Sequence, residues 1–408
     1  MKALGLEQIS QVTHQLPENP RLIVSGNFST PLALVNALDS QLPEYRLNIL
    51  NAQVGLPNRP GVNYETAFVG PGMRGSERLA YFPARLSLLP RLIKTHTLPD
   101  LVVLHTSTPR NGFVSLGSEV NILPAAIESA RKHGALVIAQ ANANMPYTFG
   151  DAEISLTDID YIFDVDAPLL VKEHVEPTQV ATLIGHRIAE KIKDGSTLQL
   201  GIGAIPDAVL GELRTRTGLR VWTEMFSDGV LGLRDSGALD TEQDMVASFV
   251  FGSQELYDWI NLNPQIRMRR TEVTNSSGNI AQQPQMMSIN AALQVDLFDQ
   301  ANSSRVNSRI YSGFGGATDF IIGALNARGG LAFMALPSWH AKTDSSTIIP
   351  KLIEPVTSFQ HSYVVTEHGA ALCAGESQEQ QARNIITFAA HPNARDELTN
   401  AAHDLGIF

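Results

Sequence analysis

Cysteine is almost absent from this 408-residue chain, in which Cys373 is the single example. One cysteine excludes an internal disulfide and every zinc or redox motif that needs a pair of thiols, so a reducing compartment suits the protein and we expect it in the cytoplasm. Charged residues (17%) and aromatic residues (7%) are also few, whereas hydrophobic residues make up 43%. This composition is typical of a globular protein and far from the profile of a disordered chain.

Positive charge is in deficit, because 30 lysines and arginines face 41 aspartates and glutamates and leave a net charge of −11. A chain with this balance does not attract nucleic acid, so any anionic ligand must be held by local groups. Long apolar runs are missing too: residues 1–15 hold no continuous hydrophobic segment, and Asn326, Arg328 and three glycines interrupt the stretch 320–339. We therefore expect neither a secretory signal nor a membrane span.

Three common catalytic motifs are absent as well. The sequence has no Gly-x-Ser-x-Gly elbow, no His-Glu-x-x-His pair and no Gly-x4-Gly-Lys-Ser/Thr loop. The sequence thus gives no motif evidence for a serine hydrolase, a zinc protease or a P-loop nucleotide triphosphatase, and we expect no metal site.

What the chain does contain is an alternation of short apolar runs with longer segments of helical period, which predicts βαβ units and mostly parallel sheets. The expected strands are residues 22–24, 47–50, 101–104, 136–139, 198–200, 220–223, 332–336 and 363–365, and the expected helices include 122–132 and 178–193. The acidic segment 165–177 carries Pro168 and Pro177 and marks a boundary. We expect two α/β domains, residues 1–176 and 177–408.

The two halves share a local pattern at an offset of about 175 residues. In the first half, Gly26 ends an expected strand and Pro31 follows it five residues later. In the second half, Gly201 and Pro206 have the same spacing after another expected strand. In each half an apolar pair four residues apart follows the proline. Proline is tolerated at the start of a helix, where its missing N–H would have no partner. The pattern predicts two similar open, mostly parallel α/β domains that face each other across an active-site cleft, with ligands at the carboxyl ends of the strands.

The segment Leu198-Gln-Leu-Gly201-Ile-Gly203-Ala-Ile-Pro206 passes from an expected strand through two glycines into a helix. Backbone N–H groups in such a loop can approach an anion closely, and the helix N-terminus adds about half a positive charge. The first-half counterpart has Phe28 where Gly203 stands, so only the second loop suits a phosphate. A tight turn that needs glycine for a positive φ is the structural alternative.

Glu224 ends the next expected strand, about 20 residues after Gly203, and this spacing permits two functional interpretations. In an NAD-binding oxidoreductase the glycines would meet the pyrophosphate and Glu224 the ribose, but Pro206 stands at the third glycine of that fingerprint. In the other interpretation Glu224 is a carboxylate nucleophile to which a thioester is delivered. A surface glutamate after an edge strand is the alternative without a function.

A third cluster places Asn290 ahead of Gly313-Phe-Gly315-Gly316. Three glycines in four positions expose successive backbone N–H groups, which suits an oxyanion hole or an anion nest. Asn290 could add its side-chain amide. A glycine-rich bend and a buried structural asparagine are the alternatives.

At these residues the chain resembles the acetyl-CoA hydrolase/transferase family, which includes acetate, 4-hydroxybutyrate and itaconate CoA-transferases, and the resemblance covers most of the chain. In the first half it rests on residues 106–117 (Thr-Ser-Thr-Pro-Arg-Asn-Gly-Phe-Val-Ser-Leu-Gly) and on Asn142-Ala-Asn-Met-Pro146. In the second half the matching motifs are residues 194–206, Thr223-Glu-Met225, Ser288-Ile-Asn290, Gly315-Gly316 with Asp319-Phe320, Ala335-Leu-Pro-Ser338, Val364-Val-Thr-Glu367-His-Gly369 and Ala390-His-Pro392. Each motif is weak alone, and their number and order make the match specific.

The resemblance implies an enzyme with acyl-CoA and a short carboxylic acid as substrates, no permanently bound cofactor and a homo-oligomeric assembly. It implies that Glu224 becomes covalently bonded to CoA. Donors to the thioester oxygen are then Asn290, Gly315 and Gly316, and the residues that contact CoA are Gly201, Ile202, Gly203, Ala204, Ile205, Gly313 and Lys342.

The implied reaction is CoA transfer by a ping-pong route. Attack of Glu224 on a donor acyl-CoA gives a mixed anhydride, the released thiolate forms a glutamyl-CoA thioester, and a second acid reverses the steps. We expect no general base, because a carboxylate is ordinarily ionised at neutral pH. An acyl-CoA hydrolase, which passes the acyl group to water, would use the same residues and stays open. The loop Gly26–Pro31 is less glycine-rich than the family's usual loop, and we expect it to shape the acid pocket.

Overall fold

The computed structural model describes residues 1–172, 176–201, 203–356 and 360–408. Contacts within the chain divide it into two units, which are described in turn. The first comprises Met1–Glu173, Asp244–Thr274 and Ile310–Gly315, and the second comprises His174–Gln243, Asn275–Arg309 and Gly316–Phe408. The domain boundary at residues 176 and 177 stays a prediction, and no local sequence pattern indicates that two later segments pack with the first unit.

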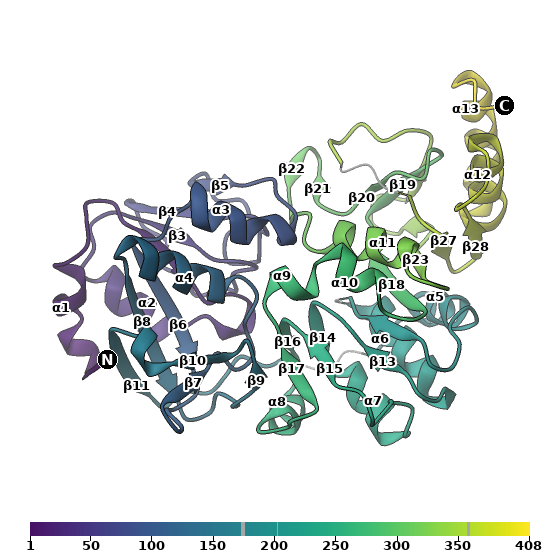
Figure 1. The fold of residues 1–408 in the computed structure, drawn as a ribbon. Helices are drawn as coiled ribbons and strands as arrows, with labels where there is room; N and C mark the ends of the chain where they lie inside the picture. Colours follow the sequence, from purple (N-terminus) through teal and green to yellow (C-terminus); the bar gives the residue numbers. More distant parts are fainter. Residues whose placement is uncertain (173–175, 202, 357–359) are drawn as a thin grey trace. The chain divides into compact units, whose positions relative to one another are not determined.

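The first unit is built on an eight-stranded sheet with the order β1-β11-β8-β6-β2-β3-β4-β5, in which all neighbouring strands are parallel (Figure 1). Its strands are β1 Lys2–Leu4, β2 Arg21–Val24, β3 Tyr45–Asn48, β4 Val62–Thr66, β5 Leu79–Tyr81, β6 Leu101–Thr106, β8 Leu136–Asn142 and β11 Tyr161–Val165. Every residue of the central strand β6 is buried. The four strands expected from apolar runs in this part of the chain are confirmed as β2, β3, β6 and β8, since a strand buried on both faces needs a continuous apolar run.

Helix α4 (Leu123–His133) shows how local sequence sets a helix in this unit. It buries an apolar face, carries three basic residues in its last turn, and ends at Gly134, whose φ of 75° gives the left-handed cap that glycine favours. It packs on β6 and β8, beside α3. The unit's other helices are α1 Ser10–Thr13, α2 Leu32–Asp39, α3 Leu89–Thr95, α8 Gln254–Ile260 and α9 Thr271–Thr274, and its short strands are β7 Phe113–Ser115, β9 Phe149–Gly150, β10 Glu153–Ser155, β15 Met245–Ala247, β16 Phe249–Phe251 and β17 Ile266–Met268.

The second unit has a six-stranded sheet with the order β13-β12-β18-β23-β27-β28, parallel except for the last pair. Its strands are β12 Thr197–Gln199, β13 Arg220–Val221, β18 Met286–Ala291, β23 Leu331–Ala335, β27 Tyr363–Thr366 and β28 Gly369–Leu372. These include the four strands expected from residues 198 to 365. Two open, mostly parallel α/β units confirm the predicted fold class.

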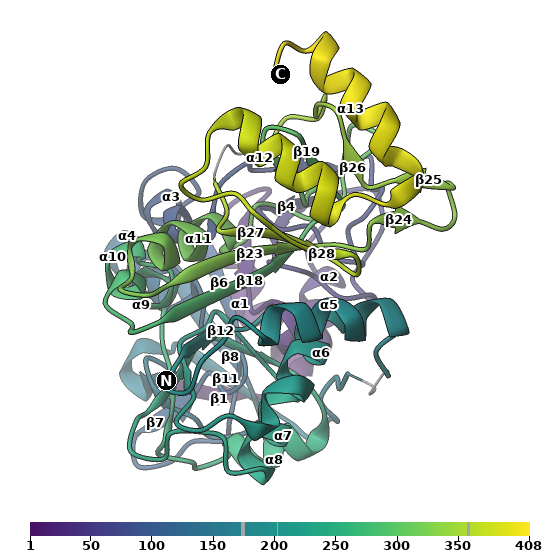
Figure 2. The ribbon, with the colours of Figure 1, turned by 90° about the vertical axis from the view of Figure 1, so that its right-hand side faces the viewer.

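Helices pack on this second sheet, where α11 (Ala317–Asn326) contacts β18 and β23 and α5 (Gln179–Ala189) contacts β27 and β28. Figure 2 shows α11 on one side of these strands and α5 with α6 (Ala204–Glu212) on the other. The remaining helices are α7 Gly229–Asp235, α10 Ser277–Ala281, α12 Gln378–Asn384 and α13 Arg395–Asp404, and the remaining strands are β14 Met225–Ser227, β19 Gln294–Asp296, β20 Ala301–Asn302, β21 Arg305–Val306, β22 Arg309–Ile310, β24 Trp339–His340, β25 Ser345–Ser346 and β26 Ile348–Ile349. Within the described ranges, no helix combines the length and the apolarity needed to cross a bilayer.

The repeated pattern corresponds to strand–loop–helix in both units, β2 to α2 and β12 to α6. Pro31 directly precedes α2, whereas Pro206 is the third residue of α6. The second helix therefore begins two residues earlier than expected, which proline permits because the first N–H groups of a helix have no intrahelical partner.

Candidate active site

The carboxyl edge of the second sheet gathers the segments that the sequence singled out. From β12 the chain moves to β13 on one side, and later to β18 on the other, so a topological switch point lies between β12 and β18. Ligands of open parallel sheets bind outside the carboxyl ends of the strands at such a point. The Gly201–Gly203 loop follows β12, Asn290 lies near the end of β18, and Glu224 follows β13, the neighbour of β12.

The turn that carries Glu224 is tied to the end of β12. The hydroxyl of the fully buried Thr223 accepts a hydrogen bond from the Leu200 N–H at 3.0 Å and donates to the Met225 carbonyl at 2.9 Å. Because both bonds involve backbone groups, they fix the position of the chain next to Glu224. The threonine thus orients the glutamate relative to the glycine loop.

Two residues enclose the carboxylate of Glu224. The amide Nδ2 of Asn275 donates to its Oε2 at 2.7 Å. Gly316, the N-cap residue of α11, lies so close that a Cβ there would overlap both Oε2 and the Asn275 amide. The reason for glycine at 316 is therefore space rather than conformation, since its φ of −98° is open to any residue.

The surroundings of Glu224 hold its proton more tightly than water would. Burial of the carboxyl group is the largest cause that raises its pKa to about 7, the Asn275 hydrogen bond acts in the opposite direction, and the charge of Asp319 raises it further. The whole residue Glu224 is half-buried, but its carboxyl group lies away from solvent. The expectation of a fully ionised carboxylate at neutral pH is wrong for the free protein, because desolvation penalises the charged form.

The predicted CoA loop forms as a strand-to-helix turn with its glycine in a left-handed conformation. Gly203 has a φ of 120°, and a Cβ added there would meet no atom, so the backbone at this point faces open space. Gly203 is the N-cap of α6, and Ala204 and Ile205 are its first residues. Gly201 lies against Pro206 and the Ile289 carbonyl, whereas Ile202 lies outside the described residues.

Asn290 is half-buried at the same sheet edge, and its amide has partners of its own. Nδ2 donates to the Ser288 hydroxyl at 2.9 Å and lies 3.5 Å from Oε1 of Gln199. The contact with Gln199 links β18 to β12 near their carboxyl ends, whereas the bond to Ser288 lies within β18. A donation to a thioester oxygen by Asn290 stays a prediction, and it requires the amide to exchange these partners.

The structure distributes the remaining predicted residues differently. Gly316 contacts Glu224, but Gly313 and Gly315 belong to the first unit, where added Cβ atoms would meet Ala67 and Phe68. Lys342 is exposed in the hairpin between β24 and β25.

Sequence reasoning missed Asn275 and Asp319. Asn275 is 51 residues from Glu224 in the chain, in a segment that no family motif or strand pattern singles out, and Asp319 stands in the sequence only as part of a family motif. The one available signal was that Asp319 follows Gly316 at the start of a helix, where acidic residues are favoured.

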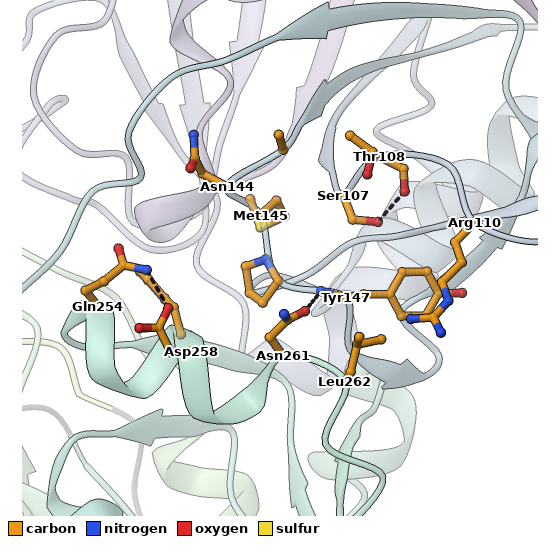
Figure 3. A pocket seen from close by; sticks show the side chains of 13 residues that line it. Ser107, Thr108, Arg110, Asn144, Met145, Tyr147, Gln254, Asp258, Asn261 and Leu262 are labelled. Carbon is orange, nitrogen blue, oxygen red and sulfur yellow. Dashed lines mark hydrogen bonds between the residues drawn. The ribbon is translucent and has the colours of Figure 1, made fainter.

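A separate cavity of about 380 Å³ lies in the first unit at the carboxyl ends of β6 and β8 (Figure 3). None of the predicted site residues lines it. Its polar groups are largely bonded within the unit, since Gln254 donates to Asp258 and the Tyr147 N–H donates to Asn261. No group of three His, Cys, Asp or Glu side chains among the described residues could hold a metal ion.

The fold and the arrangement of this site are those of a CoA-transferase. Comparison with known proteins identifies the family. The acetyl-CoA hydrolase/transferase N-terminal domain matches residues 61–171, and the corresponding C-terminal domain matches residues 252–402. The chain therefore belongs to the acetyl-CoA hydrolase/transferase family, which confirms the resemblance inferred from the motifs.

Individual relatives agree with this assignment. The chain is 36% identical to 4-hydroxybutyrate coenzyme A transferase of Clostridium kluyveri over 95% of this chain and 94% of that protein. It is 34% identical to a succinyl-CoA:acetate/propanoyl-CoA:succinate CoA transferase of Fasciola hepatica, covering 95% and 86%. Among solved structures, RipA from Yersinia pestis matches with a TM-score of 0.90 at 29% identity, covering 100% of this chain and 98% of that one.

Proposed function

We propose that this protein is a CoA-transferase, which moves CoA from a short acyl-CoA to a small carboxylic acid through a glutamyl-CoA thioester on Glu224. The observation that carries the proposal is the carboxylate of Glu224, enclosed by Asn275 and Gly316 at the switch-point edge of the second sheet. Family membership and the names of the most similar relatives support it.

The chemistry needs only this carboxylate and donors around it. Oε1 of Glu224 attacks the thioester carbonyl, the C–S bond breaks, and a mixed anhydride and the CoA thiolate result. The thiolate then attacks the glutamyl carbonyl, the donor acid leaves, and the thioester remains on the enzyme. The acceptor acid repeats both steps in reverse order, and no proton has to be transferred to a leaving group.

A raised pKa suits this nucleophile. A carboxylate that is poorly solvated is a stronger base and nucleophile than one in water, and approach of the thioester costs little further desolvation. The protein therefore works on the fraction of Glu224 that is ionised, which is about half at pH 7 for a pKa of about 7.

We assign CoA binding to the loop from Gly201 to Ile205. Support comes from the open space in front of Gly203 and from the N-terminus of α6, because the first N–H groups of a helix have no partner within the helix and favour phosphate oxygens. Lys342 adds a positive charge on an exposed hairpin of the same unit and is proposed as a second contact.

We assign the choice of acid to the loop after β2, at the switch point of the first sheet between β2 and β6. The ring of Phe28 stacks on Phe251 with centroids 3.8 Å apart, and Asn27 donates to the buried Glu119 at 2.6 Å. An apolar ring beside a polar network favours a short aliphatic carboxylate.

One substrate panel tests the proposal. Enzyme is incubated with acetyl-CoA alone, and propionate or 4-hydroxybutyrate is then added. A CoA-transferase turns over only with the acid, whereas an acetyl-CoA hydrolase, the name that several relatives carry, turns over with water alone. Absence of turnover under every condition would contradict both functions.

Covalent trapping tests the residue. Borohydride added to enzyme and acyl-CoA without acceptor reduces a thioester but not a free carboxylate, so it should inactivate the enzyme and convert Glu224 to an alcohol visible by peptide mass. A reduced residue elsewhere, such as Glu367, would contradict the assignment of Glu224.

The assembly, compartment and domain boundary complete the proposal. We propose a homo-oligomer in the cytoplasm with domains 1–176 and 177–408. Light scattering on the purified protein measures the oligomeric state, and limited proteolysis around residue 176 tests the domain boundary.

A further inference from the structure

The cavity of about 380 Å³ in the first unit has one basic and one acidic end. Of the described residues that line it, Arg110 is the one base and Asp258 the one acid. The two lie on opposite sides of the view in Figure 3, Arg110 next to the ring of Tyr147 and Asp258 next to Gln254. A volume of this size falls within the range of about 300–1,000 Å³ that small-molecule sites occupy.

The guanidinium group of Arg110 is available to a ligand. It lies over the ring of Tyr147, with 5.7 Å between its carbon and the ring centre, and this cation–π contact leaves its N–H donors unused. Within the described part of the chain no carboxylate pairs with it. Two nearby acids have other partners, since Glu153 accepts from the Tyr147 hydroxyl at 2.9 Å and Asp166 accepts from the Asn144 amide at 2.8 Å. The free fork of donors matches the two oxygens of a carboxylate.

The acidic end keeps a free oxygen. Oδ1 of Asp258 accepts from Nε2 of Gln254 at 2.8 Å, one turn earlier on α8, whereas Oδ2 has no partner among the residues that the structure describes. An ammonium group would supply both the donor and the opposite charge. Met145 and Leu262 lie between the two ends in Figure 3, and their apolar side chains suit a hydrocarbon segment.

The wall between the two ends is fixed by hydrogen bonds. The Tyr147 N–H donates to Oδ1 of Asn261 at 2.9 Å, and the Tyr147 carbonyl accepts from the Leu262 N–H at 2.8 Å. Leu262 has a φ of 57°, a left-handed conformation that bulky residues rarely adopt. Strained backbone that its surroundings hold in place is typical of ligand sites. The wall thus combines a fixed shape with one strained residue.

We propose that this cavity is a second ligand site, which binds a small zwitterion with its carboxylate on Arg110 and its ammonium group on Asp258. The two charges select the ligand, because a simple anion would leave Asp258 unpaired and a simple cation would leave Arg110 unpaired. Since the charged residues stand at opposite ends with apolar side chains between them, the ligand is an ω-amino acid, whose charges are separated by a carbon chain. The inference goes beyond CoA transfer and does not rest on the role of Glu224.

Calorimetric titration of the whole chain with a series of ω-amino acids, from 3-aminopropionate to 6-aminohexanoate, tests the proposal. At least one member should bind. The unsubstituted carboxylate and the amine of the same length should each bind about tenfold more weakly, because each lacks one charge-assisted hydrogen-bonded pair. A carboxylate that occupies the acid pocket of the proposed transferase would still bind to Arg110→Ala, so only binding that this variant loses is assigned to the cavity.

Two substitutions assign the ends. Arg110→Ala and Asp258→Asn should each raise the Kd of the bound ω-amino acid about tenfold, and Arg110→Lys, which keeps the charge but loses the fork, should have a smaller effect. Arg74→Ala is the matched control, because Arg74 is also an exposed arginine of the first unit and lies 4.0 Å from the ring centre of Tyr311. It should leave the Kd unchanged, and Tm shows that each variant folds.

Several outcomes overturn the inference. They are no binding of any member of the series at millimolar concentration, equal binding of the zwitterion and the matching carboxylate, a Kd within about threefold of the wild type in Arg110→Ala, or the same loss in Arg74→Ala. Failure of the proposed function is recognised separately, because absence of CoA transfer in the wild type leaves these binding constants unaffected.

Discussion

Replacing the proposed nucleophile should make the protein more stable, and by an amount that depends on pH. Glu224 is kept in surroundings that raise its pKa from 4.5 to about 7, mainly by burial. The ionised carboxylate is therefore less favourable in the folded protein than in the unfolded chain. Glu224→Gln removes the charge and retains an oxygen that can accept from Asn275.

The sign follows from proton binding. Between about pH 4.5 and pH 7 the folded state keeps a proton that the unfolded chain has released, so the stability of the wild type falls as pH rises through this window. Each pKa unit corresponds to about 1.4 kcal/mol, and the variant does not titrate. Its free energy of unfolding should exceed that of the wild type by about 3 kcal/mol at pH 8 and by less than about 1 kcal/mol at pH 5.

Thermal unfolding without ligand, at pH 5 and pH 8, measures this difference. About 3 kcal/mol in a unit of this size corresponds to a rise in Tm of about 5–10 °C. Glu242→Gln, which changes an exposed glutamate of the same unit, should leave Tm nearly unchanged at both pH values. A gain for Glu224→Gln that is equal at the two pH values, or a loss at pH 8, would refute the reasoning.

Three further substitutions probe the site. Gly316→Ala should abolish turnover, because its Cβ overlaps the Glu224 carboxylate, and a crystal structure or Tm would show that the fold survives. Gly203→Val should raise the KM for acyl-CoA strongly while Gly211→Val, equally uncrowded but inside α6, should not; equal effects would contradict a role in CoA binding. Asn290→Ala should lower kcat about 10²-fold if its amide reaches the thioester oxygen, whereas a loss of Tm alone would leave it a link between β18 and β12.

The sequence by itself determined the features that depend on neighbouring residues. Apolar runs such as 101–104 predicted the buried strands, since a strand covered on both faces has to be apolar throughout. The sequence also predicted that Glu224 lies near the Gly201-x-Gly203 loop and is a candidate nucleophile. Both follow neighbouring parallel strands, and the carboxyl ends of such strands lie at one edge of the sheet. Family motifs then gave the chemistry expected of that residue.

Tertiary structure decided what depends on residues far apart in the chain. Asn275 donates a hydrogen bond to Glu224 although the two residues are 51 positions apart in the chain. The carboxylate has room there because Gly316, from a third segment, has no side chain. The amide of Asn290, a plausible donor by sequence, bonds within the sheet. The pKa of Glu224 follows from all of these together, because desolvation and nearby charge are set by packing and have no local signature in the sequence.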